Sequence, residues 1–185
     1  EVKVLEPGKA YWVRSSKECT LGTAQTFTLT LHLIDNWNHI SVPLEDANLT
    51  LQRLYEECGV VFAFYWDPNE EKYVVKRHSE DANYRLEPGI GYAIRVFEKE
   101  CDIELRGKPW EFEPIELGAG KWYFIGTPYE KVDVHDILGT CALEDLNVIH
   151  SDYSSGSEER REVKVLEPGK AYWVRSSKEC TLGAK

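Results

Sequence analysis

The feature that most restricts how this chain of 185 residues can fold is an internal repeat. The 22 residues at its start, EVKVLEPGKAYWVRSSKECTLG (1–22), recur without one change at 162–183. Identity over this length indicates a recent duplication, a homogenised repeat or an engineered copy, so that either segment can complete the same fold. The alternative is that the first copy is the remaining half of a further module at the edge of an array.

A second and older repeat underlies the identical one. The stretch LEPGIGYAIRVFEKECDIELRG (86–107) parallels LEPGKAYWVRSSKECTLG (166–183), with the same Leu-Glu-Pro-Gly turn, aromatic strand and Glu-Cys pair. Upstream, NWNHISVP (36–43) parallels GKWYFIGTP (120–128). Similar pieces that return in the same order are typical of repeat architectures.

Between these landmarks LTLQRLYEEC (49–58) parallels VDVHDILGTC (132–141). We therefore predict three parts, which are the duplicate segment 1–22, a first module over 23–107 and a second module over 108–185. The predicted fold class is mainly β (a β-rich α+β chain). It consists of two tandem strand–helix–hairpin–strand modules with one short helix each.

Local patterns support this reading of the modules. TFTLTLHL (26–33) and WEFEPIEL (110–117) alternate apolar and polar residues, as a half-buried strand does. The helix of the first module has one stripe of side chains at helical spacing that should be buried, namely Leu51, Leu54, Tyr55 and Cys58. Each Pro-Gly pair should form a tight turn with its glycine at positive φ, at Gly8, Gly89 and Gly169.

The cysteines suggest disulfides rather than a metal or redox site. No pair has the CxxC spacing of a zinc ribbon or a thioredoxin-type motif. Cys19 is the duplicate of Cys180, and the other four occupy matching positions in the two modules. We predict the pairs Cys58–Cys101 and Cys141–Cys180, with Cys19 either free or exchanging with Cys180. An even set of this kind is typical of an oxidising compartment, and the interior of a hyperthermophile would permit the same bonds.

Charge and hydropathy exclude several classes of partner. The formal charge is −10 and the pI about 5.0, with no basic stripe for phosphates, so we expect no nucleic-acid partner. Anionic membrane surfaces are disfavoured for the same reason. No run of 18 apolar residues exists, so we expect no membrane insertion. Because the chain contains no methionine, we interpret it as a processed, secreted fragment or a trimmed one.

No catalytic or cofactor-binding motif emerges from the sequence. The five histidines lack the HExxH spacing of a metalloprotease, and GAGK (118–121) lacks the length and the hydroxyl residue of a phosphate loop. The stretch DPNEEK (67–72) starts like a calcium loop but lacks the glycine and the final glutamate. We therefore expect a protein that is not an enzyme and has no cofactor or metal site.

The aromatic residues and one sequon leave a binding role open. Aromatic strands are most often core, because rings supply much burial per residue. A row of exposed rings on a sheet would instead stack on sugars, so glycans are a possible partner. Asn48-Leu49-Thr50 is a glycosylation sequon, which has meaning if the chain is exported.

The quoted repeat pieces carry a resemblance to a known type of module. NWNHISVPL, LEPGIGYAIRV and LEPGKAYWVRSSKECTLG resemble the repeat of secreted and cell-surface (surface-layer-like) proteins of archaea and some bacteria. That repeat reads roughly Gly-Trp-Asn-Leu-Ile-Ser-x-Pro, a helix, and then Leu-x-Pro-Gly-x-Gly-Tyr-Trp-Val. The resemblance covers about Asn36 to Gly183 and implies an extracellular or cell-surface location, with no catalytic residues to transfer.

These observations favour a structural, self-associating module. Two identical segments compete for one place in the second module, so one copy is always surplus and exposes an apolar strand edge. A second molecule can cover that edge by strand addition or segment exchange, giving a homo-oligomer or filament built on 1–22. The alternatives are a carbohydrate-binding module and an engineered alternate-frame or domain-swap protein. The side chains predicted to make the assembly are Tyr11, Trp12, Val13 and Leu21, with their twins Tyr172, Trp173, Val174 and Leu182.

Overall fold

The computed structural model describes residues 16–17, 26–97, 99–153 and 157–183, and these form a mainly β protein. The strands of its first half are β1 (Phe27–Leu33), β2 (Asn36–Ile40), β3 (Leu44–Glu45), β4 (Phe62–Asp67), β5 (Lys72–Arg77), β6 (Tyr92–Val96) and β7 (Cys101–Pro109). Those of the second half are β8 (Ile115–Leu117), β9 (Trp122–Ile125), β10 (Val132–Asp133), β11 (Leu146–Asp152), β12 (Glu159–Glu162), β13 (Val165–Leu166), β14 (Tyr172–Ser176) and β15 (Cys180–Leu182). The helical elements are α1 (Leu51–Cys58), α2 (His78–Asp81) and the 3₁₀ turns η1 (Val134–Ile137) and η2 (Leu143–Asp145).

Each half contributes one four-stranded antiparallel sheet, and the two sheets have corresponding strand orders. The first is β2-β6-β4-β5 and the second, read from the corresponding edge, is β9-β14-β11-β12. The registers correspond too, since Tyr92 lies opposite Ile40 and Tyr172 lies opposite Ile125. Smaller sheets of order β1-β7-β3, β15-β8 and β10-β13 complete the fold. β7 extends to Pro109, past the module boundary predicted at 107, and that boundary stays a prediction.

Each half also buries an apolar cluster of its own. The first cluster contains side chains from β1, β6, β7 and α1, and the second contains side chains from β8, β9, β11, β14 and β15. One fully buried tyrosine marks the same place in each cluster. The hydroxyl of Tyr92 accepts a hydrogen bond from the Glu87 backbone N–H at 3.0 Å, and the hydroxyl of Tyr172 accepts one from Glu167 at 2.9 Å. These bonds satisfy a polar atom that burial would otherwise leave without a partner.

The tight turns predicted at the Pro-Gly pairs are confirmed at two positions. Gly89 has φ 78° and Gly169 has φ 81°, a region that side chains with a Cβ rarely adopt. Both glycines also sit close to the other half of the molecule. A Cβ on Gly89 would lie 2.8 Å from the Trp110 ring, and one on Gly169 would lie 2.6 Å from Leu31. Gly8 lies outside the described residues.

Helix α1 differs from the prediction in one side chain. The Thr50 hydroxyl accepts a hydrogen bond from the Arg53 N–H at its start, and Gly59 at φ 70° ends it. Leu51, Leu54 and Cys58 are buried, whereas Tyr55 is 44% exposed, so its predicted burial is wrong. Tyr55 lies at the margin of the apolar stripe and stacks on the imidazole of His78, with 4.0 Å between ring centroids.

The short helix predicted over 132–141 in the second half is wrong. This stretch forms strand β10 and the 3₁₀ turn η1, which Asp133 caps by accepting from the His135 N–H at 2.8 Å. Gly139 follows at φ 58°, a backbone conformation that a right-handed helix cannot contain. The helical-looking spacing of Val134 and Ile137 therefore serves a single turn, and both side chains are buried in the second cluster.

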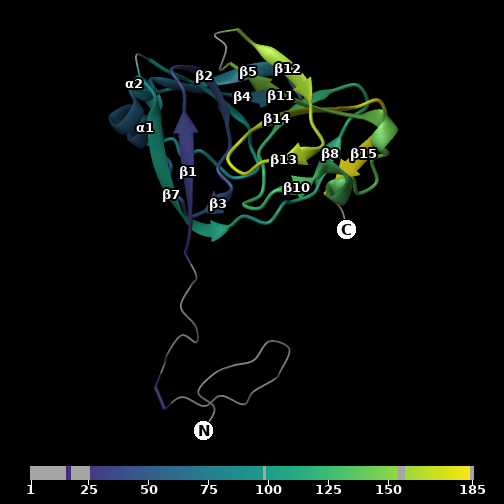
Figure 1. Ribbon diagram of the computed structural model, residues 1–185, viewed down its shortest axis with the longest axis horizontal. Helices are drawn as coiled ribbons and strands as arrows, with labels where there is room; N and C mark the ends of the chain where they lie inside the picture. The colour runs from purple at the N-terminus through teal and green to yellow at the C-terminus, as the bar shows by residue number, and fades with distance from the viewer. Residues whose placement is uncertain (1–15, 18–25, 98, 154–156, 184–185) are drawn as a thin grey trace.

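The two large sheets meet beside their edge strands β2 and β9 through reciprocal backbone bonds. Ser41 donates to Gly169 at 2.9 Å, and Ala171 donates to His39 at 3.2 Å. In the same sense Gly126 donates to Gly89, and Gly91 donates to Phe124. The halves thus contact each other with equivalent segments, as the subunits of a two-fold symmetric dimer do. In Figure 1, β1, β7 and α1 lie at one side of this junction and β8 and β15 at the other.

Candidate functional site

The C-terminal copy of the duplicated segment, 162–183, closes the second half of the molecule. It supplies one strand to each of three sheets, because β13 pairs with β10, β14 lies between β11 and β9, and β15 pairs with β8. The preceding strand β12 (Glu159–Glu162) lies at the edge of its sheet, and all of its residues are exposed. Removal of this segment would therefore leave three sheets with unpaired edges.

The side chains of this segment divide between two environments. Tyr172, Val174 and Leu182 are at most 2% exposed and belong to the second apolar cluster. Trp173 points to the opposite face of the sheet, as the period of a strand requires, and stacks on Phe124 with 4.6 Å between ring centroids. Their predicted twins Tyr11, Trp12, Val13 and Leu21 lie outside the described residues.

Both disulfides predicted from the sequence are present. Cys58 at the end of α1 is joined to Cys101 at the start of β7, and Cys141 after η1 is joined to Cys180 at the start of β15. In each half the cross-link therefore ties the helical segment to the last strand. The second bond fastens the duplicated segment to the rest of its half. Cys19, the twin of Cys180, lies outside the described residues.

An aromatic cavity of about 210 Å³ opens between the two large sheets. Six side chains from both halves line it, namely Trp66, Tyr73, Trp122, Ile149, Arg160 and Trp173. Three of the rings stand nearly perpendicular to Trp173, at 76° for Trp66, 86° for Tyr73 and 89° for Trp122. Their centroids lie 5.4 to 6.3 Å from that of Trp173, the edge-to-face geometry that aromatic quadrupoles favour.

Polar contacts hold the walls of this aromatic cavity in place. The indole N–H of Trp66 donates to the backbone carbonyl of Trp122 at 2.9 Å, across the junction of the halves. The Arg175 guanidinium lies 5.7 Å from the Trp122 ring centroid. Arg160 donates to the Glu158 carboxylate at 2.7 Å. That bond holds the pKa of Glu158 below its ordinary value.

A second cavity of about 230 Å³ adjoins the first and shares Tyr73 with it. Its other lining residues are Trp37, His39, Phe64, Ala93 and Tyr153. Tyr73 is 46% exposed and is the most accessible ring in the linings of these two cavities. Burial raises the pKa of Tyr153 to about 12, with the Glu158 carboxylate as the next cause.

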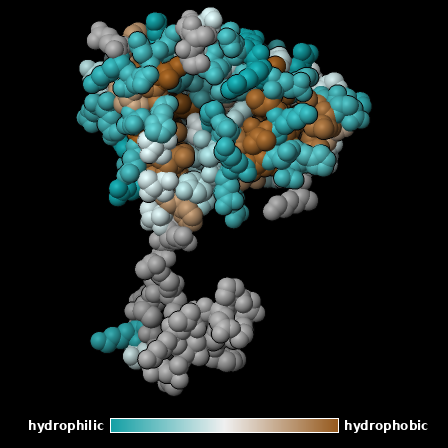
Figure 2. Space-filling model, viewed as in Figure 1, coloured by the Kyte–Doolittle hydropathy of each residue, from teal (hydrophilic) through white to brown (hydrophobic). Residues whose placement is uncertain are grey.

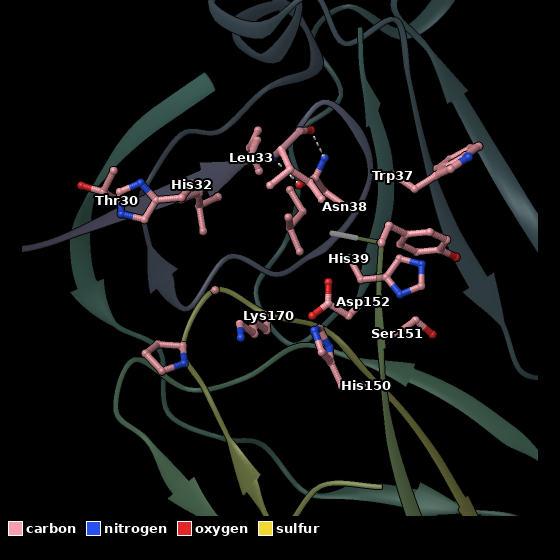
Figure 3. A pocket seen from close by; sticks show the side chains of 16 residues that line it. Thr30, His32, Leu33, Trp37, Asn38, His39, His150, Ser151, Asp152 and Lys170 are labelled. Atoms are coloured by element: carbon pink, nitrogen blue, oxygen red, sulfur yellow. Dashed lines mark hydrogen bonds between the residues drawn. The ribbon is translucent and has the colours of Figure 1, made fainter. Parts of the chain in front are cut away.

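A third cavity, of about 270 Å³, is lined by three histidines, and sequence reasoning did not single out two of them, His39 and His150, as a pair. Figure 3 shows the imidazoles of His39 and His150 with Asp152 on one side of this histidine cavity and His32 on the other. Burial, and after it the nearby His150, lower the pKa of His39 to about 4. Burial also lowers the pKa of His150, against the raising effect of its bond to the Ala171 carbonyl. At neutral pH both rings are therefore uncharged.

The repeat itself carried a signal for the special position of His39. In the parallel of NWNHISVP with GKWYFIGTP, His39 occupies the place of Phe124, which indicates a packed ring rather than a surface histidine. The two rings contact each other edge to face with 5.0 Å between centroids. Nδ1 of His39 is buried and has no hydrogen-bond partner among the described residues. Such an atom is tolerated as long as the ring stays neutral.

The remaining sequence predictions fall on the surface. Asn48 is exposed with φ 49°, in the loop before α1, while the sequon hydroxyl of Thr50 caps that helix.

In the described part of the chain, no group of three or more His, Cys, Asp and Glu side chains could hold a metal ion. None of the helices described there has the length and apolar character needed to cross a membrane.

An apolar surface lies over the duplicated segment near β13. Figure 2 shows hydrophobic side chains gathered over this strand on the face that carries it. Val165 of β13 is 42% exposed, and Leu143, which lines a cavity together with Val163 and Leu146, is 53% exposed. Exposed apolar side chains mark interaction surfaces where they gather, whereas single ones are ordinary.

Comparisons with protein-family models, with curated proteins and with solved structures give no match for this chain.

Proposed function

We propose that the chain is a non-catalytic structural module of the cell exterior that associates with further copies through its duplicated segment. The observation that carries this proposal is the position of 162–183, which completes three sheets and one apolar cluster. Because 1–22 has the same residues in the same order, it can make every one of those contacts in another molecule.

The exchange of one copy for the other costs little in contact energy. The same buried side chains, Tyr, Val and Leu, enter the same environment, so the balance between the closed and exchanged forms depends on concentration and linkage. Whichever copy is left out exposes an apolar strand with unpaired backbone groups. The surplus copy is best covered when it fills the vacant place in a second molecule whose own copy is displaced. Such exchange leads to dimers or head-to-tail chains.

The disulfide Cys141–Cys180 controls when this exchange can occur. Once the bond has formed, 162–183 cannot leave its place without the bond being broken. The thiolate of Cys19 in a second molecule can attack the sulfur of Cys141. A new Cys19–Cys141 bond forms and the Cys180 thiolate leaves, so that no external oxidant is consumed. Exchange is thereby either a step of folding before oxidation or a thiol–disulfide exchange between neighbours.

The extracellular location belongs to the same proposal. Disulfides persist in oxidising compartments and are rare in the cytosol of mesophiles. Two of them occupy corresponding positions in the halves, and the sequon residue Asn48 is exposed. The exposed apolar side chains of Val165 and Leu143 would add contacts with a neighbouring copy.

Light scattering on three proteins tests the proposal. The full chain should form dimers or longer species at hundreds of micromolar, whereas the variant that lacks 1–22 should be a folded monomer. The variant that lacks 162–185 should fold as a permutant in which 1–22 fills the vacant place. A full chain that is monomeric over this concentration range would instead support the edge half-module.

A matched cysteine variant separates covalent from non-covalent exchange. Peptide mapping of the oligomer without reductant should find Cys19 joined to Cys141 of another chain. Cys19→Ser should remove that cross-link while it leaves the Cys58–Cys101 bond intact. Oligomers of Cys19→Ser that persist without a cross-link would show exchange before oxidation. Oligomers unaffected by deletion of 1–22 contradict the role of the segment.

A further inference from the structure

The aromatic cavity between the sheets differs from a sealed core, because its rings are partly open to solvent. Trp66, Trp122 and Trp173 are half-buried and Tyr73 is exposed. One face of Trp173 is covered by Phe124, at an interplanar angle of 19°. The perpendicular rings around it form the sides of a box. A ligand that enters this box contacts aromatic surface from several directions.

The chemistry of the box restricts what such a ligand can be. Aromatic faces carry negative potential and attract either cations or the weakly positive C–H groups of a sugar ring. Among the described residues that line the cavity, Arg160 is charged and none is a carboxylate, which disfavours a cationic ligand. The Arg160 side chain presents N–H donors to the cavity and is held by its bond to the Glu158 carboxylate, which also accepts from the Ser151 hydroxyl at 3.2 Å. Sugar hydroxyl groups can accept from these N–H donors.

The size of the cavities adds a second restriction. A volume near 210 Å³ is far larger than the roughly 10–15 Å³ that a single water needs, and it suits one six-membered sugar ring. The adjoining cavity of about 230 Å³ has a similar capacity and shares the Tyr73 ring, which contacts Trp66 of the first cavity and Phe64 of the second. Together they form two compartments with one exposed ring in the lining of both.

We propose that these two cavities bind an oligosaccharide of pyranose rings with equatorial substituents, such as β-1,4-linked glucose or N-acetylglucosamine units. Rings of this kind have flat C–H faces that stack on aromatic side chains. The walls are held before the ligand arrives, by the bond from Trp66 to the Trp122 carbonyl, which reduces the ordering cost of binding. The proposal goes beyond the assembly function and requires only that one copy of the duplicated segment supplies its tryptophan, Trp173 or Trp12.

Titration of the full chain with cellohexaose and with chitohexaose tests this proposal. At least one hexasaccharide should bind saturably, with a change in tryptophan emission and a heat signal in calorimetry. It should bind more tightly than free glucose or N-acetylglucosamine, because two compartments are filled rather than one. Absence of saturable binding of both hexasaccharides at millimolar concentration overturns the proposal.

Two tyrosines of nearly equal exposure provide a matched pair of variants. Tyr73→Ala should weaken hexasaccharide binding about five- to tenfold, the effect of one lost aromatic contact. Tyr55→Ala, which removes a ring that is 44% exposed on α1, should leave the affinity unchanged. Equal affinities for the two variants would contradict the proposed site, provided that both retain the near-ultraviolet circular dichroism of the parent.

Further measurements distinguish the other possible occupants and the assembly function. Choline is the probe for a quaternary ammonium site. Choline binding without saccharide binding would overturn the proposal in favour of a cation site. Removal of 1–22 should leave saccharide affinity unchanged, because Trp173 remains in place. A monomeric full chain that binds saccharide would therefore contradict the assembly function alone.

Discussion

The two halves of the molecule build the same four-stranded sheet order from side chains that differ at most positions. At corresponding places one half has Ala93 and His39, and the other has Trp173 and Phe124. The first half covers its sheet with the helix α1, whereas the second does so with the turn η1. Strand pairing and the buried tyrosines are thus the shared frame, while the cover and the rings at the junction vary. Each of the following predictions changes one position in both halves, or exchanges one half's residue for the other's.

The largest effect is expected from the disulfides. Removal of Cys141–Cys180 by double substitution with alanine should lower the free energy of unfolding by about 4 kcal/mol, from the entropy of a closed loop of this length. Cys58–Cys101 should contribute about the same, because the sequence separations are 43 and 39. Urea unfolding of the variant that lacks 1–22 measures both. A clearly smaller loss for Cys58–Cys101 would show that α1 is held by packing alone.

The next effect concerns pH and the pair His39 and Phe124. The pKa of His39 is about 4 in the folded chain and 6.5 when unfolded, so the unfolded chain binds more protons between these values. The contribution of His39 to the free energy of unfolding is therefore fully present above pH 6.5. It falls by about 3 kcal/mol as the pH drops to 4.

His39→Phe, which copies the residue of the other half, provides the control for this pH effect. It should flatten the stability profile between pH 6.5 and 4 relative to the parent, as urea unfolding at a series of pH values would show. The contributions of His150 and of the carboxylates remain in both proteins. Parallel profiles for the two proteins would assign the acid sensitivity to those groups instead.

A smaller difference is expected at the two turn glycines. Gly89→Ala and Gly169→Ala both place a Cβ at positive φ, which costs about 1 to 2 kcal/mol. The Cβ at Gly89 meets the rigid Trp110 ring, whereas that at Gly169 meets the end of the flexible Leu31 side chain. Gly89→Ala should therefore lower the melting temperature more than Gly169→Ala. An unchanged melting temperature for both would refute the turn assignment.

The smallest effect is expected at the caps of the two covers. Thr50→Ala removes the side-chain acceptor at the start of α1 and should cost about 1 kcal/mol. Asp133→Ala removes the corresponding acceptor of η1 and should cost less, because only one turn depends on it. Hydrogen exchange at Arg53 and His135 reports each loss locally. Equal losses would mean that the turn and the helix depend on their caps alike.

Several features of the fold could be read from residue patterns. The Pro-Gly turns and both disulfide pairs followed from matching positions in the repeat, and alternation indicated the strand in 26–33. The strand predicted over 110–117 was too long, because only Ile115–Leu117 forms one. Spacing alone misled at Tyr55 and over 132–141, because a helical pattern does not say how far a helix extends or how wide its buried face is. Gly139 was the local signal against the second helix.

By itself, the sequence of this protein determined its β-rich class, its cross-links and its turns, because each depends on residues close in the chain or on a repeat visible in it. The aromatic cavity and the histidine cavity were decided only by the tertiary structure. Trp66 and Tyr73 of one half meet Trp122 and Trp173 of the other because reciprocal backbone bonds join the edges of two sheets. Strand periodicity states which side chains share a face, but it contains no information on which two faces come together.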